Sequence, residues 1–280
     1  MNGDQNQIAQ HLMPDCEKCF GLCCVALYFS KDDGFPTDKN AGTPCPHLNS
    51  DFRCDIYVNL ETLGMKGCIC YDCFGAGQQV SQVTFRGVDW SSNRESAQLM
   101  FDVFWVMCQL HEIQWYLLEA LSLKETALLR SKLSAALEEI LRLCLLDPQS
   151  ITELNLSDHR KKINPLLRRT SELVRKKRKR SSAKSAAALG SMIDLIGIDL
   201  RKTDLRHADL GGAFLIASNM EGMDLTGADM LCADMRDANI KGANLSESVF
   251  LTQFQVNTAI GDSTTKLPAV LRPPRHWTQG

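Results

Sequence analysis

The sequence predicts a multi-domain protein in which a cysteine-rich region, an α-helical region and a repeat follow one another along 280 residues. Three observations predict this order. Nine of the twelve cysteines lie between Cys16 and Cys73, apolar residues after Arg94 recur at helical spacing, and later ones recur every five residues. We expect domains at residues 1–93, 94–180 and 191–260, a linker at 181–190 and a C-terminal cap at 261–280.

Composition and charge exclude several classes of protein. The 31 basic residues are balanced by 33 acidic ones, which argues against a dedicated nucleic-acid binder. Residues 1–15 lack the basic and apolar parts of a secretory signal, and no apolar run approaches the ~20 residues of a membrane span. We therefore expect a cytoplasmic protein without a membrane span. Cytoplasmic thiols stay reduced, so twelve cysteines indicate metal or redox chemistry rather than disulfides.

The cysteines of the first region have spacings that suit metal ligands. The pattern runs Cys16-x2-Cys19-x3-Cys23-Cys24, continues with Cys45 and Cys54, and ends with Cys68-x-Cys70-x2-Cys73. Thiolates a few residues apart on a tight loop can converge on one ion. Four thiolates complete a zinc site or an iron–sulfur cluster, so the number of ligands does not separate the two. The predicted metal ligands are Cys16, Cys19, Cys23, Cys24, Cys45, Cys54, Cys68 and Cys73.

This region also resembles a cysteine-rich family described as a zinc- or iron-chelating domain. The family signature has a CxxxCC element, a later Pro-Cys and a Cys-x-Ile-Tyr, which match Cys19, Cys23, Cys24, Cys45, Cys54 and Tyr57. The resemblance implies zinc or an iron–sulfur cluster as cofactor. Flagellin lysine N-methylases contain a related module, which keeps an enzymatic alternative open.

Other cysteines and histidines are better explained without a metal. Cys108 and Cys144 lie on helical apolar stripes and Cys232 lies in the repeat, so we expect all three to be packing residues. His47 follows Cys45 closely enough to be either a ligand or a surface residue. His111 is one helical turn from Cys108, where core packing is favoured over a role beside a metal.

A helical hairpin or small bundle is predicted for the middle of the chain. The first helix has apolar residues at steps of three and four, and the second continues the stripe up to Asp147. Pro148 can open a third helix. The stripe positions are Leu99, Val103, Val106, Leu110, Ile113, Leu117 and Leu121, then Leu128, Leu133, Leu137, Ile140, Leu141 and Cys144.

A basic run, residues 175–180, ends the helical region. Residues 158–184 carry twelve basic and two acidic side chains, whereas residues 191–250 carry five and ten. The run could bind the phosphates of a nucleic acid, dock on the acidic repeat, or form a solvated helix end.

Twelve consecutive positions at a spacing of five are apolar beyond this run. They are Leu195, Leu200, Leu205, Leu210, Leu215, Met220, Leu225, Met230, Met235, Ile240, Leu245 and Phe250. Residues two positions earlier are mostly small. No helix or flat strand has this period, so we expect both series to point inward in a repeat structure.

Units such as Ala208-Asp209-Leu210 and Ala243-Asn244-Leu245 resemble the pentapeptide-repeat family. The resemblance implies a right-handed quadrilateral β-helix with four repeats per coil, and therefore about three coils for twelve repeats. Some family members protect DNA gyrase by imitating duplex DNA. Seven aspartates before central positions could form such an acidic surface: Asp194, Asp199, Asp204, Asp209, Asp224, Asp229 and Asp234.

The preferred interpretation is a metal-binding protein whose repeats dock a protein partner in an interaction or sensing role. No serine-hydrolase, nucleotide-binding or kinase motif is present, so a binding protein is favoured over an enzyme. Two alternatives stay open. One is an antibiotic- or toxin-resistance protein acting on a target such as gyrase, and the other is an iron–sulfur enzyme that modifies a protein or small molecule.

Overall fold

The computed structural model describes residues 10–35, 38–92, 94–176 and 194–277, which form two compact units, Met1–Leu167 and Arg168–Gly280. The expected linker at 181–190 and most of the basic run at 175–180 lie outside the described residues.

Short helices separated by turns make up the cysteine-rich region. Two antiparallel bridges, Phe29 with Lys39 and Leu48 with Cys54, hold the turns together. Gly21 and Gly75 precede helices with φ of 64° and 72°, a left-handed conformation that favours glycine. The helices are η1 Cys16–Lys18, α2 Leu22–Ala26, η2 Lys31–Asp33, η3 Tyr57–Asn59, α3 Lys66–Cys70, α4 Ala76–Gln78 and the π-helical η4 Gln79–Thr84.

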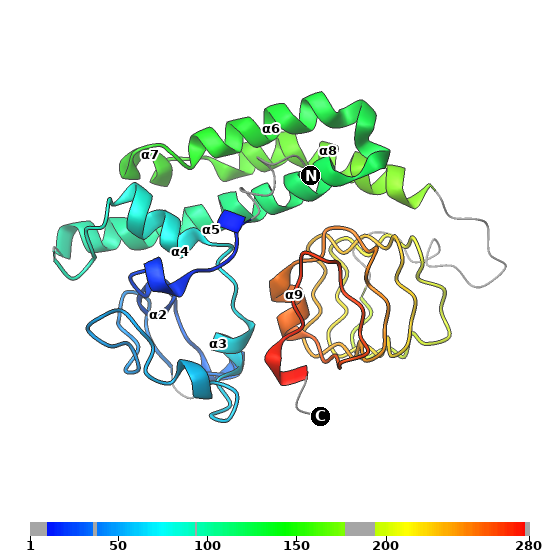
Figure 1. Cartoon of the computed structure of the whole chain (residues 1–280), viewed down its shortest axis with the longest axis horizontal. Helices are drawn as coiled ribbons and strands as arrows, with labels where there is room; N and C mark the ends of the chain where they lie inside the picture. Colours follow the sequence, from blue (N-terminus) through cyan, green and yellow to red (C-terminus); the bar gives the residue numbers. More distant parts are fainter. Residues whose placement is uncertain (1–9, 36–37, 93, 177–193, 278–280) are drawn as a thin grey trace. The chain divides into compact units, whose positions relative to one another are not determined.

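Helix α5, Arg94–Ser122, is the central element of the first unit. It contacts α2, α4, α6 and α7, and Figure 1 shows α6 running beside it. It is therefore buried on more than the single stripe predicted from the sequence, and residues such as Met100, Phe104 and Met107 join that stripe in the core. One long helix thus supports both the cysteine-rich region and the helices that follow.

Three further helices complete the predicted helical region. Helix α6, Arg130–Leu143, buries Leu133, Leu137 and Ile140 as expected. Leu128 was wrongly placed on the same stripe; it lies in the 3₁₀ helix η5, Lys124–Leu129, and is 96% exposed. Helix α7, Pro148–Thr152, begins at the predicted proline, and α8 spans Leu156–Arg175. Among the described residues, no helix is long and apolar enough to cross a membrane.

The repeats form stacked coils (Figure 1), but their strands are reduced to isolated bridges. Parallel bridges join residues 20 positions apart, for example Asp199 with Asn219 and Asn219 with Asn239. A 20-residue offset with a five-residue period means four repeats per coil, as the resemblance implied. The handedness of the winding stays a prediction.

All twelve central residues of the repeat are buried, and so are the small residues from Ala208 to Ser248 that precede them by two positions. The sequence pattern therefore identified the core of this unit correctly. The unit closes with α9, Gln253–Thr258, and η7, Arg275–Trp277. The Gln255 amide donates to the carbonyls of Met230 and Ala233, and the Trp277 ring N–H donates to the carbonyl of Ala259. Carbonyl groups of the last coils thereby accept hydrogen bonds from the closing segment.

The aspartates of the repeat have a structural use at its corners. In seven repeats the carboxylate that precedes the central residue accepts the backbone N–H two positions later, as Asp224 does from Thr226 at 3.0 Å. Asn219, Asn239 and Asn244 make the same bond with an amide oxygen. Such turns favour Asp and Asn for local geometry, whatever the surface charge.

The last turns of α8 pack against the repeats within the second unit. Thr170, Ser171 and Val174 are buried, and Arg175 forms a 2.9 Å ion pair with Asp209. The first residue of the basic run therefore docks on the acidic repeat, one of the uses predicted for the run. Lys176 is exposed, and residues 177–180 lie outside the described residues.

Candidate metal centre

The eight predicted ligands lie on the short helices and turns of the first unit, together with Cys70, which is buried. None of the twelve cysteines forms a disulfide. Seven of the eight are partly shielded from solvent, whereas Cys16 is exposed. The charges of the sulfurs act on one another mainly within two sets.

The first set joins Cys24, Cys45, Cys54 and Cys68. Burial, and then the charges of Cys24, Cys45 and Cys54, raise the pKa of Cys68 to about 12. Burial also raises the pKa of Cys45 and of Cys54, and the charge of Cys24 adds to both. The backbone brings these residues together, because Cys45 donates its N–H to the carbonyl of Cys24 at 2.9 Å and Cys54 bridges to Leu48.

The second set contains Cys19, Cys23 and Cys73. A Cβ added to Gly77 would lie 2.6 Å from the sulfur of Cys19 and 4.0 Å from that of Cys73. Glycine is therefore needed at this position for the two loops to meet. Burial, and then the Asp72 carboxylate, raise the pKa of Cys73 to about 12, and the charge of Cys19 contributes.

A fourth sulfur of the second set comes from α5 and was missed in the sequence. Burial, followed by the charge of Cys73, raises the pKa of Cys108 well above its ordinary value, and the charge of Cys19 adds to this. The Tyr71 hydroxyl lies 3.7 Å from the Cys108 sulfur. The prediction that Cys108 is only a packing residue overlooked this surrounding, because Tyr71 and Cys73 are more than 30 positions away in the chain.

The adjacent residues Cys23 and Cys24 lie where the two sets meet. Their sulfurs are 3.9 Å apart. The hydrogen bond between them, more than burial, raises the pKa of Cys23, and the same bond lowers the pKa of Cys24. Of the two sulfurs, Cys24 therefore gives up its proton more readily than Cys23.

Backbone N–H groups point at several of these sulfurs. Leu22 donates to the sulfur of Cys19 at 3.5 Å, and hydrogen bonds from the backbone of Gly75 and Gly77 partly offset the raised pKa of Cys73. Hydrogen bonds from the backbone of His47 and of Ile56 likewise partly offset the raised pKa of Cys45 and of Cys54, respectively. Such donors stabilise a thiolate rather than a thiol, and thiolate is the form that binds metals.

Lys39 supplies a buried positive charge beside the cysteines. Its ammonium donates to the carbonyls of Val25, Leu27, Asn40 and Thr43 and lies 4.5 Å from the centre of the Phe29 ring. Its pKa is lowered by burial, against which the charges of Cys45, Cys24 and Cys23 act. Within the described residues it forms no ion pair with a carboxylate. The thiols of Cys45, Cys24 and Cys23 are therefore the acidic groups that act on the Lys39 ammonium.

The two histidines have other partners. His47 Nδ1 lies 3.1 Å from the Asp55 carboxylate. His111 is buried, its Nδ1 lies 2.7 Å from the carbonyl of Phe74, and burial lowers its pKa to about 4. The neutral ring can thus donate to that carbonyl and fix the Cys73–Phe74 turn on α5.

Two cysteines outside both sets, Cys144 and Cys232, were predicted to be packing residues. Cys144 is buried and its sulfur accepts a hydrogen bond from the Gln114 amide, which agrees with this prediction. Cys232 is exposed at a corner of the repeat, so the prediction was wrong for it.

The donor set suits zinc or an iron–sulfur cluster in kind, since thiolates are the ligands that both prefer. Within the part of the chain that the structure describes, no group of three or more His, Cys, Asp or Glu side chains stands ready to hold a metal ion. Metal binding would therefore have to draw the sulfurs of a set closer together.

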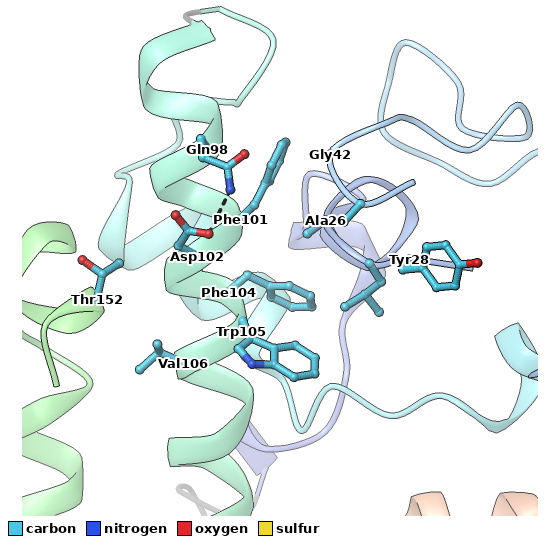
Figure 2. A pocket seen from close by; sticks show the side chains of 12 residues that line it. Ala26, Tyr28, Gly42, Gln98, Phe101, Asp102, Phe104, Trp105, Val106 and Thr152 are labelled. Atoms are coloured by element: carbon cyan, nitrogen blue, oxygen red, sulfur yellow. Dashed lines mark hydrogen bonds between the residues drawn. The ribbon is translucent and has the colours of Figure 1, made fainter. Parts of the chain in front are cut away.

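A hollow of about 520 Å³ lies beside the cysteine loops and α5 (Figure 2). Ala26, Leu27 and Tyr28 follow Cys24 on one wall, and Ala41 and Gly42 precede Cys45. Helix α5 supplies Trp105, which is 59% exposed, and Asp102, whose carboxylate accepts a 2.9 Å hydrogen bond from Gln98. Apolar and aromatic walls with one carboxylate could receive a small molecule or a side chain of a partner.

Comparisons with known proteins agree with the repeat and leave the cysteines unassigned. The family model described as Pentapeptide repeats matches residues 193–222 and 215–250. The chain is 55% identical over 272 residues to the Uncharacterized protein YybG of Bacillus subtilis (strain 168), a match that covers 97% of both chains. All three regions therefore lie within this similarity. No solved structure matches the chain.

Proposed function

The chain belongs to the family of the Bacillus subtilis protein YybG, and we propose on this premise that it is a metal-binding protein with an attached docking surface. In this proposal the cysteine-rich region holds zinc or an iron–sulfur cluster. The pentapeptide repeats present a rigid face to a protein partner, in an interaction or sensing role.

The observation that carries the proposal is the buried Lys39 ammonium among the thiols. A buried cation is costly unless an opposite charge compensates it. Neutral thiols offer little compensation, whereas four thiolates on a divalent zinc ion leave a net charge of about −2. An anionic metal–thiolate group would thus supply the missing counter-charge, and the backbone N–H groups on Cys19, Cys45, Cys54 and Cys73 would share it.

The bound group would supply either a structural cross-link, if it is zinc, or an electron carrier, if it is a cluster. The chain's own residues have separate parts in this. Lys39 and the backbone N–H groups balance the charge of the sulfurs, Gly77 lets two cysteine loops approach, and His111 holds the Cys73 turn against α5. The twelve free thiols favour a reducing compartment such as the cytoplasm.

Metal content and the absorption spectrum of the full chain, purified without oxygen, test the proposal. Stoichiometric zinc without visible absorbance indicates a structural or sensing site. Iron with acid-labile sulfide and a band near ~400 nm indicates a cluster. A Cys144→Ala/Cys232→Ala variant is the matched control and should keep the full metal content, because neither residue belongs to the two sets. Protein that holds neither zinc nor iron, and does not take them up, would exclude the proposed function.

The hollow beside the cysteine loops favours an enzyme as the second candidate function. A substrate placed between Tyr28 and Trp105 would lie against the loops that carry Cys24 and Cys45. This candidate requires a redox-active cluster. A ligand that enters the hollow should change the fluorescence of Trp105. The Trp105→Phe variant is the control, in which this change should be absent. If the protein binds only zinc, this candidate is excluded, and the hollow would instead receive a side chain of a partner protein.

DNA mimicry by the repeats is the less favoured alternative. Three of the seven aspartates, Asp199, Asp204 and Asp234, are ion-paired with the arginine two residues later. Asp229 is buried, and Asp209 pairs with Arg175. The acidic surface available to a DNA-binding target is therefore smaller than the sequence suggests, and we favour docking of another protein.

A further inference from the structure

We infer that the cysteines form two separate four-sulfur sites, divided between the adjacent residues Cys23 and Cys24, and that Cys108 of helix α5 completes one of them in place of Cys16. This inference rests on the proposed metal-binding function. Site A would consist of Cys19, Cys23, Cys73 and Cys108. Site B would consist of Cys24, Cys45, Cys54 and Cys68.

The electrostatic effects of the sulfurs on one another follow this division, and metal binding would draw each set together. In site B, charges interact in all six pairs of sulfurs. In site A they interact in five of six pairs, all except Cys23 with Cys108. The charges of both members of this remaining pair, and that of Cys73, act on the Tyr71 hydroxyl.

Side-chain contacts place Cys108 against site A independently of charge. The ring of His111, one helical turn after Cys108, lies 2.7 Å from the carbonyl of Phe74, the residue next to Cys73. The hydroxyl of Tyr71, two residues before Cys73, lies 3.7 Å from the Cys108 sulfur. Gly77 brings Cys19 to the same turn. Two segments and one long helix thus meet at this group of sulfurs.

Cys16 fits neither site. It is exposed, and its charge interacts with Cys19 and Cys24, which belong to different sets. Arg53 bonds to the carbonyls of Cys16 and Glu17 and holds η1 at the surface. In this inference the CxxC spacing of Cys16 and Cys19 does not mark a pair of ligands.

Metal content per chain tests the division directly. The anaerobically purified full chain is compared with Cys108→Ala, Cys54→Ala, the double variant, Cys16→Ala and Cys144→Ala. We expect Cys108→Ala and Cys54→Ala each to lose half of the wild-type metal, and the double variant to lose all of it. Cys16→Ala should keep the full amount. Cys144→Ala is the matched control, since Cys144 is another shielded cysteine beside α5 with an amide partner, Gln114.

A second substitution separates ligand loss from misfolding. Cys108→Ser keeps the side-chain volume, and circular dichroism of the metal-free proteins checks that α5 is intact. Half the metal in a fully helical Cys108→Ser or Cys108→Ala protein supports the inference. Full metal in both variants overturns it, as does a loss of half the metal in Cys16→Ala. Wild-type protein without metal would instead contradict the proposed function itself, so the two failures are distinguishable.

Discussion

The cysteine-rich region and the pentapeptide repeats bury their cores in opposite ways. In the repeats the same two positions of every five residues fill the interior, and each coil rests on a coil 20 residues away. In the cysteine-rich region no period exists, and turns are held by hydrogen bonds to sulfur, by one buried lysine and by contacts with α5. The comparison teaches that a repeated core is held by the same apolar burial and the same corner hydrogen bonds in every coil, whereas turns without a repeat depend on individual contacts.

The largest difference should appear when metal is removed. Chelation of the purified protein should strongly lower protection of backbone amides in residues 16–84, because structural zinc sites contribute apparent binding energies of about 10–16 kcal/mol. Protection in residues 205–250 should stay unchanged. Hydrogen exchange followed by mass spectrometry resolves the two regions. Equal loss of protection in both would show that the stability of the repeats also depends on the metal.

Phe250→Ala should have the largest effect within the repeats. Its ring is fully buried, and truncating a buried phenylalanine costs about 3–5 kcal/mol. Phe254→Ala, four residues further, is the control, since that ring is 41% exposed and should cost less than about 1 kcal/mol. Chemical denaturation, with exchange in residues 194–277 as the local readout, gives both values. Similar costs for the two variants would contradict the role assigned to the central positions.

Lys39→Met should destabilise the cysteine-rich region by about 1.5–3 kcal/mol, because four carbonyls lose a charged donor. The cost should be larger in the metal-loaded than in the metal-free protein if the ammonium balances thiolate charge. Lys31→Met, at an exposed position of the same region, should have little effect in either state. Thermal unfolding of the wild type and the two variants, with and without metal, measures this. An equal cost in both states would leave Lys39 a purely structural role.

The smallest effect concerns the paired aspartates of the repeats. The hydrogen bond from Arg201 lowers the pKa of Asp199 from 3.8 to about 2. Because the folded value is below the unfolded one, the stabilisation is present above about pH 4 and is lost as the pH falls towards 2. Arg201→Ala should raise the pKa of Asp199 towards its ordinary value, as read from carboxyl carbon resonances. Arg206→Ala, which removes the neighbouring pair with Asp204, should leave Asp199 unchanged.

The aspartates also show that one sequence feature allowed two explanations. A row of Asp at fixed spacing suggested an acidic surface, but in seven repeats the carboxylate accepts a backbone N–H at the corner. Asn makes the same bond in three others. The occurrence of Asn at equivalent positions was a signal in the sequence that hydrogen bonding, more than charge, selects these residues.

What the sequence determined by itself is whatever repeats over short distances. The helical stripe of α5, the start of α7 at Pro148 and the buried columns from Leu195 to Phe250 follow from local periods, because each residue's environment repeats that of its neighbours. The tertiary structure alone decided which cysteines lie near distant turns. Cys108 lies beside the Cys73–Phe74 turn because His111 and Tyr71 join α5 to it, while Cys16 is exposed despite its suitable spacing. Such contacts depend on how turns pack on a helix, and no local period encodes that packing.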